Sequence, residues 1–180
     1  MTSPNSDSDE LLIQVSEDDE TILGPVARRL VHGNPALIHR AVHVLVLNSE
    51  GALLLQLRSL KKDTQPGKWD TSVGGHVGFG QSYEEAALRE TEEELGIRPD
   101  ITDLRYLYFS KIRYAVESEN IRTFLCRHEG PFVPHPDEVD AVRFWKRDDI
   151  LASLGSGIFT PNFEEEFAAF CASPNGILLK

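Results

Sequence analysis

One segment of 23 residues, from position 75 to position 97, constrains this chain more than the rest of its 180 residues. It reads GHVGFGQSYEEAALRETEEELGI, a glycine-rich turn followed by a helical stretch that Gly96 ends. Its last turns crowd Glu90, Glu93 and Glu94 together beside Arg89. Carboxylates this close repel one another, so a divalent cation is the natural compensating group, and hard cations such as Mg²⁺ take oxygen ligands. The segment therefore predicts a metal site and points to chemistry on phosphates.

Helical geometry divides these carboxylates into two groups, because residues advance by about 100° each around a helix. The apolar stripe of the helix consists of Ala87, Leu88, Thr91 and Leu95. Glu90 and Glu94 border this stripe, where an uncompensated carboxylate is costly. Glu85 and Glu92 fall on a face that water can solvate. A solvated acidic surface explains the second pair but does not explain the first.

The segment resembles the signature of the Nudix family. The positions in register are Gly75, Arg89, Glu90, Glu93, Glu94, Gly96 and Ile97. Two positions depart from the pattern: Gln81 stands where the first glutamate is expected, and Thr91 replaces an aliphatic residue. Gln81 keeps a carbonyl oxygen but lacks the charge of a carboxylate metal ligand.

The resemblance implies roles for the acidic residues of this segment. Glu93 and Glu94 would bind metal, and Glu90 would bind metal or act as a base. Arg89 would orient a neighbouring glutamate through a salt bridge. Such an enzyme binds a small-molecule diphosphate through Mg²⁺, with Mn²⁺ as the alternative ion, and activates water for attack on phosphorus.

Composition agrees with a compact enzyme of one domain. The net charge of −11 argues against nucleic acid or an anionic membrane as a partner. Cys126 and Cys171 form neither a disulfide framework nor a metal pattern, and no secretory signal is visible, so a cytoplasmic location is expected. Residues 1–10 are expected to be a disordered acidic tail and residues 11–180 a single domain.

Alternating apolar residues predict a mixed α/β fold. The predicted strands are residues 11–15, 38–47, 52–58, 69–73, 106–115, 121–127 and 141–145. The predicted helices, besides the one capped by Ser82, are residues 25–31, 147–154 and 162–171. Residues 38–58 are expected to form a hairpin around the turn at 48–51. The expected architecture is an α/β/α sandwich, which is also the Nudix fold, with an N-terminal strand extension that leaves a homodimer open.

Beyond this segment, roughly residues 11–170 are similar to the isopentenyl-diphosphate-isomerase-like branch of the family. The matching stretches are residues 55–58, 62–63, 66–70, 137–145 and 159–161. The implied substrate contacts are Arg58, Lys62, Lys68, Gly75, His76 and Phe159. Solvated cations and a core aromatic residue are the competing interpretations of Arg58, Lys68 and Phe159.

An isomerase is the main alternative to a hydrolase. The isomerases of this branch carry a cysteine where this chain has Gly74, which has no side chain to move a proton. His39, His76 and Glu119 match positions of the isomerase's metal and active site, and Glu138 could supply a further ligand or base. The balance favours hydrolysis of a diphosphate, such as a nucleoside diphosphate linked to another group. A non-catalytic diphosphate-binding protein is the third hypothesis.

Overall fold

The computed structural model describes residues 10–62 and 64–180, so the predicted tail lies outside it except for Glu10. The strands are β1 (Leu11–Val15), β2 (Ile22–Ala27), β3 (His39–Leu47), β4 (Leu53–Arg58), β5 (Trp69–Asp70), β6 (Val73–His76), β7 (Arg105–Arg113), β8 (Ser118–Arg127) and β9 (Val139–Trp145). The helices are α1 (Arg28–Val31), α2 (Tyr83–Leu95), α3 (Arg147–Ser153) and α4 (Pro161–Ala172), with short 3₁₀ turns η2 (Ile101–Asp103) and η3 (Gly176–Leu178). None of the described helices is long and apolar enough to cross a membrane.

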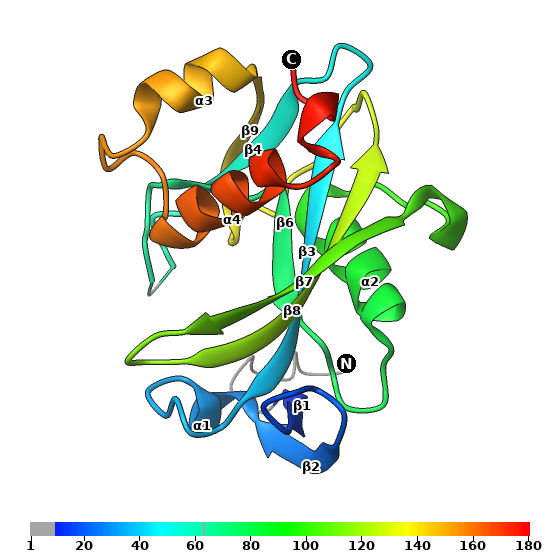
Figure 1. Cartoon of the computed structure of the whole chain (residues 1–180), viewed down its shortest axis with the longest axis vertical. Coiled ribbons are helices and arrows are strands. Elements are labelled where there is room, and N and C mark those ends of the chain that lie inside the picture. The colour runs from blue at the N-terminus through cyan, green and yellow to red at the C-terminus, as the bar shows by residue number, and fades with distance from the viewer. Residues whose placement is uncertain (1–9, 63) are drawn as a thin grey trace.

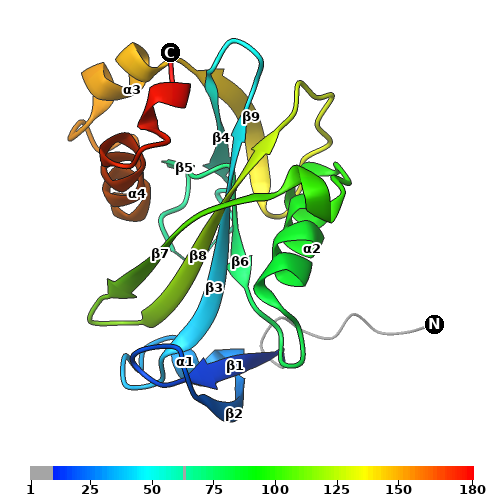
Figure 2. The same cartoon turned by 45° about the vertical axis from the view of Figure 1, so that its right-hand side comes forward.

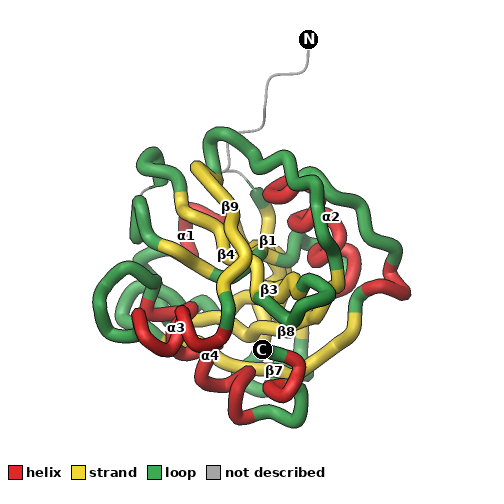
Figure 3. Tube along the Cα trace, turned by 90° about the horizontal axis from the view of Figure 1, so that it is seen from above, coloured by secondary structure: helices red, strands yellow, loops and turns green. Residues whose placement is uncertain are grey.

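The strands form a mixed sheet that helices cover on both faces, as the sequence predicted (Figures 1 and 2). Helix α2 packs one face through Ala86, Ala87 and Leu95, against the valines of β3. Helix α4 packs the other face through Phe163 and Phe167. The view from above places the strands between α2 on one side and α3 and α4 on the other (Figure 3). The α/β/α sandwich is therefore confirmed.

The predicted hairpin of residues 38–58 is wrong in its pairing. Strands β3 and β4 pair only beside the turn, at Leu47 and Leu53. Both faces of β3 are buried, and its two edges pair instead with β8 in parallel and with β6 antiparallel. Strand β4 pairs with β9 and β5. The sheet therefore splits between β6 and β4, and this split positions the candidate site.

The N-terminal extension also differs from the prediction. Pro25 lies in β2 and not at the start of a helix, and the helix that follows is only the four residues of α1. Strand β2 is the outer strand of the sheet and pairs only with β1, so a proline without an N–H group is tolerated there. The predicted strand at 69–73 is divided into β5 and β6, because the chain crosses from β4 to β3 between them.

Candidate active site

The glycine-rich turn is closed at both ends by local hydrogen bonds. Ser82 Oγ accepts from the Glu85 backbone N–H over 3.1 Å, and Glu85 Oε2 accepts from the Ser82 N–H over 2.7 Å, which forms a capping box at the start of α2. Gln81 Oε1 accepts from the Gly78 N–H over 3.0 Å. Gly96 ends the helix with a left-handed φ of 68°. In this structure Gln81 therefore holds the turn, and its oxygen is occupied there.

The acidic residues of α2 lie where the helical geometry places them. Glu94 is buried, with 7% of its surface exposed, and the Glu90 side chain is 12% exposed. The Glu93 side chain is 56% exposed, while Glu85 and Glu92 face solvent. The division into carboxylates that border the core and carboxylates that water solvates is confirmed.

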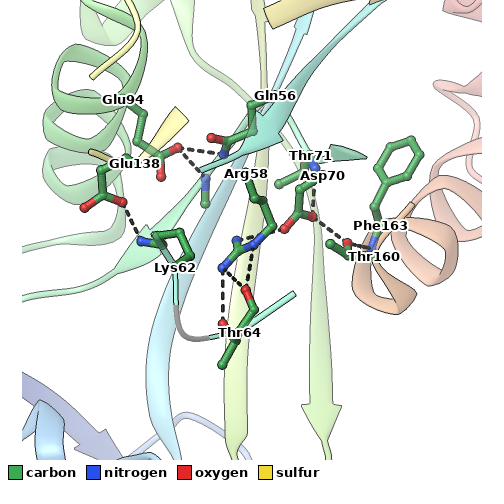
Figure 4. Close-up of polar contacts among 11 residues, drawn as sticks. Gln56, Arg58, Lys62, Thr64, Asp70, Thr71, Glu94, Glu138, Thr160 and Phe163 are labelled. Atoms are coloured by element: carbon green, nitrogen blue, oxygen red, sulfur yellow. Dashed lines mark hydrogen bonds and ion pairs between the residues drawn. The ribbon is translucent and has the colours of Figure 1, made fainter. Parts of the chain in front are cut away.

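Glu94 reaches into the split between β6 and β4. Its Oε2 accepts a hydrogen bond from Gln56 Nε2 on β4 over 3.0 Å and another from the Gly74 N–H on β6 over 3.1 Å (Figure 4). Burial, reinforced by the nearby charge of Glu90, raises the pKa of Glu94 to about 8. No local sequence pattern indicates the contact of Gln56 with Glu94, because it joins residues 38 positions apart.

Glu90 is packed against the glycine strand β6. A Cβ atom added at Gly75 would overlap the Glu90 carboxyl group and would displace it from its present position. Burial raises the pKa of Glu90 to about 7, against the opposing charge of Arg89. The guanidinium of Arg89 lies 2.8 Å from both Glu90 Oε1 and Glu93 Oε2, and it donates to the His76 carbonyl over 2.9 Å. The salt bridge that the resemblance implied for Arg89 is present.

Arg89 thus pairs with Glu90 and Glu93, while Glu94 lies buried on the same helix, and carboxylate oxygens of this kind suit a hard divalent cation. Glu90, Glu93 and Glu94 could supply its oxygen ligands. In the described structure their oxygens are turned toward Arg89, Gln56 and Gly74 and do not converge within 4.8 Å of one another.

A second cluster of metal-ligand type lies on the opposite face of the sheet. The ligand atoms of His39, His76 and Glu119 lie within 4.8 Å of one another. Glu119 Oε1 is 3.4 Å from His39 Nε2 and 3.6 Å from His76 Nε2. The strand register brings them together, since His39 faces Glu119 across β3 and β8, and Ala41 faces His76 across β3 and β6.

Burial and one hydrogen bond set the charge states of His76 and Glu119 in this second cluster. It lowers the pKa of His76 to about 3, so this imidazole is neutral. Burial opposes ionisation of Glu119, but the hydrogen bond to His39 outweighs it and lowers the pKa of Glu119 to about 2. A neutral imidazole and an ionised carboxylate are the forms that bind a metal. His32, which the sequence analysis passed over, lies with its ring 5.6 Å from that of His76.

Two of the three basic residues predicted to contact phosphate already pair with acidic side chains. Arg58 Nη1 is 3.0 Å from Asp70 Oδ2, and its other nitrogens donate to Thr64 (Figure 4). Lys62 Nζ lies 2.6 Å from Glu138 Oε2. Lys68 is half-buried beside them, on the loop that enters β5.

Phe159 is not at the surface. It is 2% exposed and packs between Trp145 and Phe163, with ring centroids 5.3 and 5.1 Å away. The competing interpretation of Phe159 as a core residue therefore describes its position. Phe159 belongs to the core cluster that α4 forms with the sheet.

Comparison with known proteins resolves the family. Residues 37–164, more than half of the chain, match the family model described as NUDIX domain. The chain belongs to the Nudix family. An uncharacterized Nudix hydrolase of Yersinia pestis is 32% identical over 155 residues, which cover 83% of this chain and 80% of that protein. The isopentenyl-diphosphate Delta-isomerase of Streptomyces avermitilis is 30% identical over 147 residues, which cover 79% and 75%.

The Nudix fold is equally clear among solved structures. The crystal structure of DR0079 from Deinococcus radiodurans aligns with a TM-score of 0.72 and 27% identity, and the alignment covers 91% of this chain and 99% of that one. A MutT Nudix hydrolase from Burkholderia pseudomallei aligns with a TM-score of 0.59, 24% identity and coverage of 71% and 94%. By family and fold this chain is a Nudix hydrolase, and isomerases are among its relatives.

Proposed function

We propose that this Nudix hydrolase cleaves a diphosphate bond, with Mg²⁺ as its cofactor, in a nucleoside diphosphate linked to another group or in a related diphosphate. The observation that carries the proposal is Glu94, a buried carboxylate at the open edge of β6 with Glu90 beside it. Burying two carboxylates is costly unless a cation compensates them. A diphosphate bound with its cation would meet that requirement.

The residues of α2 divide the work. Glu93 and Glu94, with Glu90, would hold the cation. Bound Mg²⁺ supplies charge neutralisation on the phosphate oxygens and lowers the pKa of a coordinated water. Alternatively, Glu90 would take a proton from water, and Arg89, which lies 2.8 Å from it, would fix the orientation of its carboxylate. Mn²⁺ would suit the same oxygen ligands.

Arg58 at the end of β4 and the lysines of the loop that follows would bind the phosphates. Lys62 would leave Glu138 and Arg58 would leave Asp70, and each would exchange a carboxylate for a phosphate oxygen. Glu138, once free, would be a further ligand or base. Lys68 and Gly75 would line the same site, and His76, whose side chain lies on the opposite face of the sheet, would meet the substrate from that side.

A phosphate-release assay over a panel of diphosphates, with and without Mg²⁺, tests the proposal. We expect Mg²⁺-dependent release from at least one compound, and loss of release in Glu93→Gln and in Glu94→Gln. Unchanged activity in both variants would contradict the metal assignment. No turnover across a broad panel, with tight binding of one compound, would favour a diphosphate-binding protein.

An isomerase-type enzyme is the second candidate, and one observation favours it. The His39, His76 and Glu119 cluster offers a second metal site on the other side of Gly74. Against it stands Gly74 itself, which carries no side chain that could move a proton. Conversion of isopentenyl diphosphate by the purified protein would decide for the isomerase.

A homodimer that forms through the outer strand β2 is a further proposal, and light scattering tests it.

A further inference from the structure

The sheet face turned away from α2 carries a buried ion pair that the proposed reaction does not use. His43 Nδ1 on β3 lies 2.9 Å from Glu166 Oε1 on α4. Thr123 Oγ1 donates to the same carboxylate oxygen over 3.0 Å. The side chains of His43 and Glu166 are only 13% and 7% exposed. The pair therefore ties α4 to the centre of the sheet.

The charge state of the pair gives His43 a second N–H group, at Nε2, besides the one that faces Glu166. Burial opposes protonation of His43, but the Glu166 carboxylate outweighs it and raises the pKa of His43 to about 9. The imidazole is therefore protonated at neutral pH, and both of its nitrogens are donors. Nδ1 faces Glu166, and none of the described hydrogen bonds or ion pairs uses Nε2. This N–H group is therefore available to a ligand.

His43 lies beside Gly74, the residue that bonds Glu94 of α2. The register of β3 and β6 places His43 opposite Gly74. A Cβ atom added at Gly74 would lie 3.6 Å from His43 Nε2 and 3.5 Å from a Thr71 methyl carbon, so the space beside the imidazole admits at least a methyl group. The Gly74 N–H donates to Glu94. Gly74 therefore bonds the Glu94 carboxylate through its N–H group and lies beside the His43 imidazole.

Polar atoms without partners gather around this pair. Among the described residues, Thr71 Oγ1, Tyr108 OH and Glu166 Oε2 are buried and have no hydrogen-bond partner of good geometry. Thr71 and Glu166 lie close enough for Thr71 to help lower the pKa of Glu166. Buried polar groups are nearly always paired in folded proteins. Their concentration beside His43 indicates a region that receives a polar group.

We propose that His43 is a substrate-binding residue, positioned by Glu166, which selects diphosphates whose second group carries an acceptor oxygen close to the diphosphate. The inference rests on the proposed diphosphate hydrolase, because Glu94 and its neighbours would place the diphosphate at Gly74. From there the second group extends over Gly74 to the Nε2–H of His43. A hydrocarbon group would leave that donor unpaired, and sites built to bond a substrate oxygen reject analogues without one by up to about 10⁵-fold.

Two ligands that differ by one hydroxyl group test the inference. These are dimethylallyl diphosphate and its 4-hydroxy derivative, titrated with Mg²⁺ into the whole protein by calorimetry. We expect the wild-type protein to bind the hydroxylated ligand at least about 10-fold more tightly, since hydrogen bonds to charged groups are the stronger ones. His43→Leu should bring the ratio of the two affinities close to one. His43→Gln keeps an N–H donor and should retain most of the preference.

Glu166→Gln gives a second variant, and we expect an intermediate ratio because its side chain still accepts from His43 but no longer holds it charged. Equal affinities in the wild-type protein, or a ratio that His43→Leu does not change, would overturn the inference. Binding of neither ligand would overturn it as well. The ratio is a binding measurement, so a preserved ratio without turnover of any diphosphate contradicts the hydrolase alone. Turnover of the panel with equal affinities contradicts the role of His43 alone.

Discussion

Glu94 and Gly74 are joined across the split in the sheet, where the Gly74 N–H donates to Glu94 Oε2 over 3.1 Å. This bond uses the free edge of β6, which pairs with β3 on its other side. It draws a carboxylate from the helix into the gap between two strands, beside Gln56. The buried carboxyl group of Glu94 is thereby held in the gap between β6 and β4.

Replacing Glu94 by glutamine should remove activity without unfolding the protein. The amide oxygen can still accept from Gly74, but it loses the charge that holds a cation. We expect kcat/KM to fall by more than the roughly 10- to 100-fold typical of residues that only support a metal ligand. Glu92→Gln, on the exposed side of the same helix, is the matched control and should leave kcat/KM unchanged. Steady-state kinetics with Mg²⁺ and circular dichroism of both variants make the comparison.

The two adjacent glycines of β6 should differ in their tolerance of alanine. A methyl group at Gly75 would overlap the Glu90 carboxyl group, whereas one at Gly74 would make ordinary contacts at 3.4–3.6 Å. We expect Gly75→Ala to destabilise the fold by about 1–3 kcal/mol, as overpacking does, and Gly74→Ala to change it little. Guanidinium unfolding of both variants measures this, and equal effects would contradict the packing of Glu90 against β6.

The His43–Glu166 pair should make the free energy of unfolding depend on pH. The pKa of His43 is raised to about 9 in the folded state, from about 6.5 when unfolded. The pair therefore stabilises fully below about pH 6.5, and on the order of 3 kcal/mol is lost as pH rises through 9. The lowered pKa of Glu166 gives a contribution that is present above about pH 4.5 and lost in acid.

Unfolding curves between about pH 6 and pH 9 check this for the wild-type protein and for His43→Gln, which cannot be protonated. The variant should lose the part of the alkaline decline that His43 causes. Parallel curves for the two proteins would show that the pair is not charged in the folded state.

The two candidate metal sites should separate by mutation. His39, His76 and Glu119 already converge, so they should bind Mn²⁺ without help from α2. Calorimetry should show that Glu93→Gln retains this site and that His76→Gln loses it. A metal at 100 times its Kd stabilises a fold by about 2.7 kcal/mol, so EDTA should lower the melting temperature of metal-loaded wild-type protein by more than that of His76→Gln, which keeps only the ligands of α2.

The sequence by itself determined the local features of the site. The period of about 3.6 residues assigned α2 its buried and solvated carboxylates, because neighbours on a helix are set by residues three and four apart. The residue types at its ends, Ser82 and Gly96, fixed its caps. The order of strands and helices indicated the layered fold, which the structure and the family both confirm.

Only the tertiary structure decided which distant residues meet. Strand pairing joins residues far apart in the chain, so no local pattern showed that β3 pairs mainly with β6 and β8 and meets β4 only beside the turn. That choice opens the gap that Gln56 and Gly74 share with Glu94, and it aligns His43 with Gly74. The sequence of residues 75–97 predicted the helix α2 and the placement of its glutamates, because the geometry of a helix is local. The partners that give its carboxylates their environment come from strands that fold beside it.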